Sequence, residues 1–423
     1  MNQFVFETKQ RNLFFGMMAL GVLCMILTFV GDDALHTRFW SNFLHNSLFF
    51  TGIAFTAVLF YCAQIIAYSG WITVFKRLWE AASQFLIVGL VLMGVIVAGV
   101  WGHFHHLYHW ADAPEVIKDE VLRHKAAFLN PVWYTVATFV FGGAWYFWAA
   151  KMRKISIEQD EYGTTEYKPY YKSKVWAAAF LPIGGFTSAA VIWQWVMSLD
   201  AHWYSTMFAW YTTISWLVTM IAFTILLIIY LKSKGYYQEI TREHLHDLGK
   251  YMFAFSVFWT YLWFSQFMLI WYGNIGEETV YFQNRMDNYP VLYWGNLLMN
   301  FVLPFLILLR NDTKRKYGSL IFTASLIFFG HWWDFFQMVK PGALHTAHEA
   351  IAKMSPAVVG GTEEAAKHGA EFLMGFTIPG LLEVGTFVGF IGLFLYVMFH
   401  NLTKAGLVPK NDPFLAESLQ HHV

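Results

Sequence analysis

Cysteine and charge are both scarce in this 423-residue chain. We interpret its two cysteines, Cys24 and Cys62, as packing residues because both lie inside apolar stretches. The sequence therefore has no cysteine cluster for an iron–sulfur centre and no thiol pair for redox chemistry. Charged residues make up only 13% of the chain, whereas soluble domains have about 25%. The low charge excludes an ordinary water-soluble protein, and the zero formal net charge gives no sign of nucleic-acid binding.

Apolar residues dominate instead: 57% of the chain is hydrophobic and 20% is aromatic. A stretch of about 20 apolar residues spans a hydrocarbon core of roughly 30 Å, and its backbone must be helical there. The sequence predicts an all-α polytopic membrane protein, with residues 1–423 forming a single integral membrane domain. The ten predicted spans are 12–30, 44–68, 83–101, 131–150, 175–198, 206–231, 251–271, 290–309, 318–337 and 374–399.

The distribution of basic residues predicts the orientation. With ten spans both termini lie on one side, and most of the 28 lysines and arginines fall on that side. The positive-inside rule then places both termini in the cytoplasm. The long connections are two predicted outer loops, 102–130 and 338–373, and a cytoplasmic loop, 151–174. Loop 338–373 is expected to contain short helices near 345–354 and 363–372.

A first polar island, Trp193–Thr206, separates two apolar runs. Polar groups at a membrane boundary cost free energy unless they are satisfied or used. Asp200 and His202 lie at the predicted outer mouth, where an Asp–His pair could take protons from a quinol hydroxyl. Gln194 could hold a quinone carbonyl or order water, although amides more often form hydrogen bonds between helices.

A second island, Ser265–Glu278, has the same character and contains Gln266. Asn296 and Asn300 add uncharged polar groups to the following predicted span. The same two readings apply to these amides: contacts to quinol or water, or hydrogen bonds between helices.

Asp334 lies in the polar end of the span 318–337. A helix rises about 1.5 Å per residue, so His331 is roughly 20 Å across the membrane and Asp334 a few ångströms further. The two residues are three apart and share a helix face. A carboxylate there should be partnered or neutral. It is either a proton acceptor in a relay beside a quinol, or an interfacial residue bonded to a neighbouring helix.

Glu383 is expected roughly 18 Å inside the span 374–399, close to the membrane midplane. It follows Pro379 and Gly380, and the proline would free a backbone carbonyl one turn earlier. A lone midplane carboxyl is costly and is functional by default. Proton conduction is therefore favoured over a structural hydrogen bond.

The sequence contains many histidines, but their spacing does not favour a metal site. His103, His106 and His109 would share one helical face, but no carboxylate or thiolate nearby completes a site, so interfacial packing is favoured. A transmembrane haem needs facing histidines at depth, and only His331 and, marginally, His45 are within reach. We therefore expect no metal and no haem bound by this chain.

Both polar islands resemble signatures of the F subunit of bacterial alternative complex III, over Trp193–Phe208 (WQWVMSLDAHWYSTMF) and Phe264–Glu278 (FSQFMLIWYGNIGEE). The number of spans, the cytoplasmic termini and the length fit along the whole chain. The resemblance implies kinship with the polysulfide-reductase-type membrane anchors, which have two four-helix bundles plus two extra helices. It also implies a respiratory complex of the bacterial inner membrane that oxidises quinol and reduces a cytochrome c or an attached terminal oxidase.

The resemblance further implies a chain without a redox centre of its own. Iron–sulfur clusters and c-type haems would belong to partner subunits, and quinol, such as menaquinol, would bind mainly in a homologous membrane C subunit. The other expected partners are an outer subunit resembling an iron–sulfur molybdopterin enzyme, c-type cytochrome subunits, a terminal cytochrome oxidase and membrane lipid.

The expected role of this chain in that complex is proton conduction and assembly. The alternatives are a pure scaffold or a secondary transporter, which usually has midplane charges in both halves. The relay candidates are Asp334, Glu383, His331 and Asp200, and the candidate contacts to quinol or water are Gln194, Gln266 and His202.

Overall fold

The computed structural model describes residues 3–33, 35–162, 167–354 and 377–422, and this part of the chain contains helices and no strand. The α-helices are α1 (Thr8–Val30), α2 (Thr37–Ile66), α3 (Lys76–Ser83), α4 (Leu86–Gly102), α5 (Ala113–Lys118), α6 (Glu120–Lys125), α7 (Pro131–Val136), α8 (Gly142–Glu158), α9 (Lys168–Trp195), α10 (Met207–Ser233), α11 (Arg242–Gly273), α12 (Gly276–Asn288), α13 (Pro290–Leu297), α14 (Leu303–Leu308), α15 (Tyr317–Met354), α17 (Leu381–Leu402) and α18 (Leu415–Leu419). The 3₁₀ turns are η1 (Gly70–Ile72), η2 (His109–Ala111), η4 (Gln159–Glu161), η5 (Met197–Asp200) and η7 (Thr313–Arg315). The two π-helical segments are η3 (Ala137–Phe141) and η6 (Leu298–Val302).

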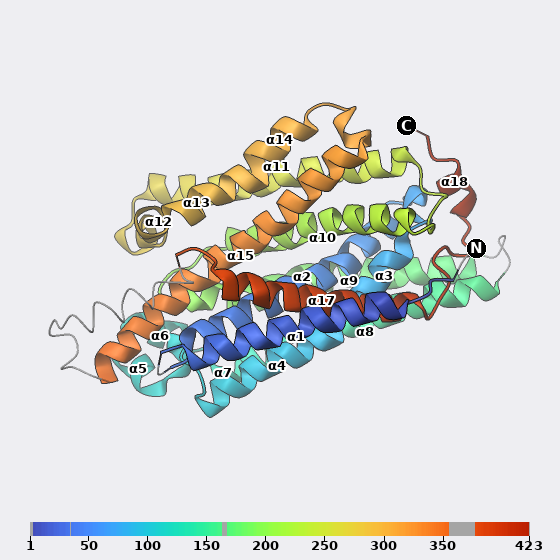
Figure 1. Ribbon diagram of the computed structural model, residues 1–423. Helices are drawn as coiled ribbons and strands as arrows, with labels where there is room; N and C mark the ends of the chain where they lie inside the picture. The colour runs from blue at the N-terminus through green and yellow to red at the C-terminus, as the bar shows by residue number, and fades with distance from the viewer. Residues whose placement is uncertain (1–2, 34, 163–166, 355–376, 423) are drawn as a thin grey trace.

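The long helices run side by side along one direction, and both termini lie at the same end of the bundle (Figure 1). We call this the terminal end. The opposite end, where α5, α6 and α12 lie, is the far end.

Helices α2 and α10 form the centre of the bundle. In the most apolar stretch of each of these two helices, 83% of the residues are buried, compared with 22% in α1. One group of mutually packed helices is α2, α4, α8 and α9, and a second is α10, α11, α13–α14 and α15. The two groups meet where α2 packs against α10 and α15.

Helices α1 and α17 pack mainly against each other, beside these groups. Their backbones approach so closely that a Cβ at Gly21 would lie 2.5 Å from the Cα of Gly389. Glycine at both positions is what permits this contact.

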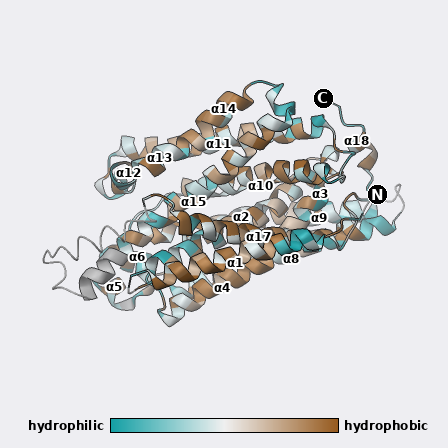
Figure 2. Cartoon of the chain, in the orientation of Figure 1, coloured by the Kyte–Doolittle hydropathy of each residue, from teal (hydrophilic) through white to brown (hydrophobic). Residues whose placement is uncertain are grey.

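The outer surfaces of the long helices are apolar, and hydrophilic residues gather towards the bundle ends (Figure 2). Large side chains such as Phe186 and Trp271 are exposed on these surfaces. Eight helices in the described residues are long and apolar enough to cross a membrane: α1, α2, α3–α4, α9, α10, α11, α13–α14 and α17. The chain is therefore a helical, multi-pass membrane protein. The predicted spans 131–150 and 318–337 are helical as well, in α7–α8 and α15. The total of ten spans stays a prediction.

Two predicted boundaries near the C-terminal part are wrong. Helix α15 continues without a break to Met354, through Pro341, so the first half of the predicted loop 338–373 is helical. The predicted helix 345–354 is the end of α15, and 363–372 lies outside the described residues. Helix α17 begins at Leu381 and not near 374, because the preceding Pro379-Gly380 pair lies outside the helix instead of kinking it.

Other connections are more helical than predicted. The predicted cytoplasmic loop 151–174 is largely taken up by the end of α8 and the start of α9, and the predicted outer loop 102–130 contains η2, α5 and α6. The predicted histidine face is also wrong. Helix α4 ends at Gly102, and His103 adopts a left-handed conformation (φ 52°) that stops it, so His103, His106 and His109 do not share a helix.

Candidate functional site

Asp334 is a completely buried carboxylate in α15. Its Oδ1 accepts hydrogen bonds from the hydroxyl of Tyr211 and from Nδ2 of Asn296 at 2.7 Å. Its Oδ2 accepts from Oγ of Ser215 at 3.0 Å and from Nε1 of Trp259 at 3.2 Å. These four donors come from α10, α11 and α13, and together they can satisfy an ionised carboxylate without an ammonium or guanidinium partner.

His331 joins this site through Ser215. The Nδ1 atom of His331 lies 2.9 Å from the Ser215 hydroxyl and 3.8 Å from Oδ2 of Asp334. A hydroxyl has one hydrogen, which Ser215 gives to Asp334, so Nδ1 of His331 must be the donor to Ser215. Nε2 of His331 is buried and has no hydrogen-bond partner among the described residues. A proton taken up at Nε2 can therefore leave from Nδ1 and reach Asp334 through the serine hydroxyl.

Local helix geometry places these groups. Asp334 lies about 25 Å along α15 from its start, and His331, three residues earlier, shares its face. Asn300, in the π-helical segment η6, fixes the position of Asn296. Nδ2 of Asn300 donates to Oδ1 of Asn296 at 2.6 Å. Residue 330 must be glycine for this arrangement, because a Cβ there would lie 2.3 Å from Oδ1 of Asn300.

A small chamber adjoins Asp334 on the side of the far end. Tyr211, Gln266 and Gln337 line it together with aromatic residues, and it has room for about one water molecule. Gln266 and Gln337 are each 5% exposed, and in the described structure neither Oε1 atom has a hydrogen-bond partner. The chamber is therefore polar enough to order water, and the Tyr211 hydroxyl connects it to the carboxylate of Asp334.

Arg285 and Tyr281 of α12 separate this chamber from a larger cavity at the far end, since both residues line both spaces. Nη2 of Arg285 lies 2.8 Å from Oδ2 of Asp200, and its guanidinium carbon lies 3.4 Å from the centre of the Tyr281 ring. Burial raises the pKa of Tyr281 above its ordinary range, so it stays a neutral hydroxyl. Asp200, which lines the far-end cavity, is thereby connected to the chamber through one arginine.

His202 also lines the far-end cavity, but it lies at the surface. Its Nε2 is 2.5 Å from Oδ2 of Asp119. Partial burial raises the pKa of Asp119, but the hydrogen bonds from His202 and from the backbone of Leu122 outweigh it and hold that pKa below its ordinary value. Gln194 lies elsewhere: its Nε2 donates to the carbonyl of Phe128 at 2.6 Å, which ties α9 to the loop before α7. A quinol or water contact of His202 or Gln194 stays a prediction.

Glu383 does not belong to this site. It lies in the first turn of α17, where Nε and Nη2 of Arg38 donate to its two oxygens at 2.7 and 2.9 Å. Asn42 and the backbone of Gly380 add hydrogen bonds at 3.0 Å each, and the buried Lys340 is close enough to interact electrostatically. The expectation of a lone midplane carboxyl is wrong, because the helix begins later than predicted and an arginine lies at the same level.

The residues that sequence reasoning missed are mainly the partners of the predicted acids: Tyr211, Ser215, Trp259, Arg285 and Arg38. Tyr211 and Ser215 are four residues apart on α10 and therefore share a face. Polar side chains on one face of an apolar helix are rare by chance, so this pair could have indicated the site. Arg285 gave no such signal, since it is a single basic residue in a polar connection.

No group of three His, Cys, Asp or Glu side chains in the described residues could hold a metal ion. Of the two histidines considered as haem ligands, Nε2 of His45 lies 2.9 Å from the carbonyl of Trp332, and the expectation that the chain binds no haem stays a prediction. No protein-family model matches the chain, and no curated protein sequence matches it. The family suggested by the two polar islands therefore stays a prediction.

Proposed function

We propose that this chain is a membrane subunit of a respiratory quinol oxidoreductase complex in the bacterial inner membrane, where it conducts protons and contributes to assembly. The observation that carries the proposal is the buried Asp334, which is connected through Tyr211 and a polar chamber to a cavity at the far end. Fully buried carboxylates in membrane helices are costly and mark proton pathways. The two packed groups of helices with α1 and α17 beside them are consistent with the implied architecture of two four-helix bundles plus two extra helices.

The proposed relay follows from the hydrogen bonds. A proton at Nε2 of His331 makes an imidazolium, whose Nδ1 proton passes to the Ser215 hydroxyl while the serine proton passes to Asp334. The product is a neutral histidine and a neutral carboxyl. For the proton to leave, the carboxyl of Asp334 turns its hydrogen towards Tyr211, and the Tyr211 hydroxyl turns its own hydrogen towards the chamber. Tyr211 then gives its hydrogen to chamber water as it accepts the one from Asp334, and the proton continues past Arg285 towards Asp200.

In this proposal the far end faces outward and both termini lie in the cytoplasm. Electron carriers would be held by the partner subunits: a homologous membrane subunit for quinol, an outer iron–sulfur subunit, c-type cytochromes and a terminal oxidase. In this proposal Asp200 and Arg285, which lie at the far end, mark the exit of the relay, on the side where quinol protons would be released.

The proposal is tested by purifying the complex with this chain carrying Asp334→Asn. The asparagine keeps the size of the side chain but cannot be protonated at this position. We expect quinol:cytochrome c turnover or the number of protons moved per electron to fall about tenfold or more, while the partner subunits still co-purify. Wild-type turnover and proton yield in Asp334→Asn would reject the relay.

A scaffold role within the same complex is the second candidate, and the Arg38–Glu383 ion pair favours it, because this pair joins α2 to α17 without contact to the relay. A scaffold predicts that Asp334→Asn lowers the yield of the complex and leaves turnover per assembled complex unchanged. Measuring both quantities on the same preparation separates the two roles.

A further inference from the structure

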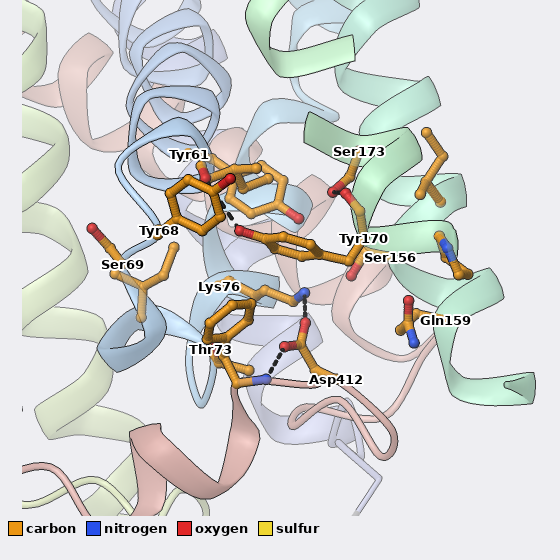
Figure 3. A pocket seen from close by; sticks show the side chains of 15 residues that line it. Tyr61, Tyr68, Ser69, Thr73, Lys76, Ser156, Gln159, Tyr170, Ser173 and Asp412 are labelled. Carbon is orange, nitrogen blue, oxygen red and sulfur yellow. Dashed lines mark hydrogen bonds and ion pairs between the residues drawn. The ribbon is translucent and has the colours of Figure 1, made fainter. Parts of the chain in front are cut away.

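A second polar pocket lies at the terminal end of the bundle, away from Asp334 (Figure 3). It is an open hollow of about 470 Å³ when the solvent at its mouth is counted, and the space that the centre of a water molecule can reach is about 30 Å³. Its walls come from the end of α2, η1 and α3, the end of α8, the first turns of α9 and the segment that follows α17. Its polar lining residues are Tyr61, Tyr68, Ser69, Thr73, Lys76, Ser156, Gln159, Tyr170, Ser173 and Asp412.

The pocket contains one positive and one negative group. Nζ of Lys76 lies 2.5 Å from Oδ2 of Asp412, and the two residues are 8% and 6% exposed. Figure 3 shows them facing each other on one side of the pocket, opposite the rings of Tyr61, Tyr68 and Tyr170. A ligand that itself carries both charges could pair with both of these groups at once.

The pocket also offers an unused hydrogen-bond donor. Ser156 is 4% exposed, and its hydroxyl has no hydrogen-bond partner in the described part of the chain. By contrast, the hydroxyl of Ser173 donates to the carbonyl of Tyr170 at 2.7 Å. A buried hydroxyl without a partner is costly, and in a pocket that also contains a lysine it is suited to an anionic oxygen.

The mouth of the pocket lies where the apolar parts of α2 and α9 end. Tyr68 is 52% exposed there, and Nζ of Lys174 lies 3.9 Å from the centre of its ring. The next residue, Val175, is 69% exposed and begins the apolar outer face of α9. Exposed tyrosines and lysines at the end of apolar helices mark the level of lipid headgroups. The pocket therefore opens towards lipid headgroups, with an apolar surface beside it for acyl chains.

We propose that this pocket binds the phosphoethanolamine headgroup of a membrane phospholipid. The phosphate would contact Lys76 and Ser156, and the ammonium would contact Asp412. The headgroup would replace one internal ion pair by two, so neither buried charge loses its partner. A glycerol headgroup has no cation for Asp412, and a choline headgroup has no N–H to donate to it. The proposal does not depend on the proposed proton relay.

The test uses the purified full chain in mild detergent after removal of bound lipid. Its melting temperature is measured with added phosphatidylethanolamine, phosphatidylcholine or phosphatidylglycerol, and with soluble glycerophosphoethanolamine. We expect phosphatidylethanolamine to raise the melting temperature most and to be the lipid that native mass spectrometry finds retained. An equal shift with phosphatidylcholine would overturn the headgroup assignment, and an equal shift with glycerophosphoethanolamine would overturn the lipid.

Variants make the test specific to the two charges. Asp412→Asn removes the partner of the ammonium, so the preference should change from phosphatidylethanolamine to phosphatidylglycerol. Lys76→Gln should weaken binding of phosphatidylethanolamine about tenfold, which corresponds to about 1.4 kcal/mol. Lys154→Gln, at an exposed lysine of α8, is the matched control and should bind as the wild type does.

If Lys76→Gln does not fold, Ser156→Val can be used in its place, because it removes only the unpartnered hydroxyl. It should weaken binding of phosphatidylethanolamine several-fold and leave both charges in place. An unchanged lipid preference in Asp412→Asn, or unchanged affinity in Ser156→Val, would contradict the proposal.

Discussion

Tyr211 donates a hydrogen bond from its hydroxyl to Oδ1 of Asp334, and the same residue lines the polar chamber next to it. It is therefore the only described group that both contacts this carboxylate and lines that chamber. A proton that moves between Asp334 and chamber water along the described hydrogen bonds has to pass this hydroxyl.

Tyr211→Phe should consequently slow proton transfer without disturbing the packing of the ring. A hydrogen bond to a charged group contributes about 1.5–3 kcal/mol, so we expect turnover of the assembled complex to fall about tenfold. Tyr293→Phe is the matched control, because Tyr293 lines the same chamber without bonding to Asp334. Equal turnover in the two variants would show that the Tyr211 hydroxyl has no special role.

Ser215→Ala should interrupt the connection between His331 and Asp334. The distance of 3.8 Å that separates Nδ1 of His331 from Oδ2 of Asp334 is too long for a direct hydrogen bond. We expect fewer protons moved per electron in reconstituted vesicles, with the protein still folded. Ser256→Ala, a buried serine of α11 whose hydroxyl has no hydrogen-bond partner in the described residues, is the control. If both serine variants move protons as the wild type does, the relay does not run through Ser215.

Glu383→Gln should destabilise the protein and leave the relay intact. Removing one partner of a buried ion pair costs about 3–5 kcal/mol, because the other charge is left unpaired. The pair with Arg38 is largely buried, so we expect a clearly lower melting temperature and lower yield, with unchanged turnover per assembled complex. The double variant Arg38→Gln/Glu383→Gln should recover part of the lost stability, as a double-mutant cycle would show. Loss of turnover at normal yield would instead show that Glu383 takes part in the proton relay.

His105 should make stability depend on pH. It lies in the connection after α4, is 4% exposed, and its Nε2 bonds to the carbonyl of Ile96 at 3.1 Å. Burial lowers its pKa to about 4, whereas the unfolded value is about 6.5. Between these two values the unfolded chain binds a proton that the folded chain does not, so stability falls as pH drops from about 6.5 to about 4, by roughly 1–3 kcal/mol.

The measurement is the melting temperature in detergent at several pH values across this window. His105→Gln keeps a donor for the carbonyl of Ile96 but cannot titrate, so its melting temperature should change less with pH than that of the wild type. Identical pH profiles for the two proteins would exclude His105 as the titrating group.

The positions of the apolar helices could largely be predicted from sequence, but their lateral neighbours could not. The shared face of Asp334 and His331 followed from helix geometry, since α15 continues unbroken through that region. The depth of Asp334 in the membrane stays a prediction. The pairing of Arg38 with Glu383 joins residues 345 positions apart, and no local pattern encodes it. The start of α17 was missed for a different reason, because Pro379 and Gly380 are compatible both with a kink inside a helix and with the turn before one.

The depth of Asp334 along α15 has a consequence for the membrane potential. With α15 as one of the ten predicted spans and its start at one boundary of a core of roughly 30 Å, a carboxylate about 25 Å along the helix would lie close to the far end of the electric field. A charge that crosses the whole membrane gains or loses about 2.3 kcal/mol per 100 mV. In that placement, protons that reach Asp334 from the far end would cross only a small part of the voltage, whereas protons that arrive from the terminal end would cross most of it. The membrane voltage would therefore act strongly on protonation of Asp334 from the terminal end and only weakly on its protonation from the far end.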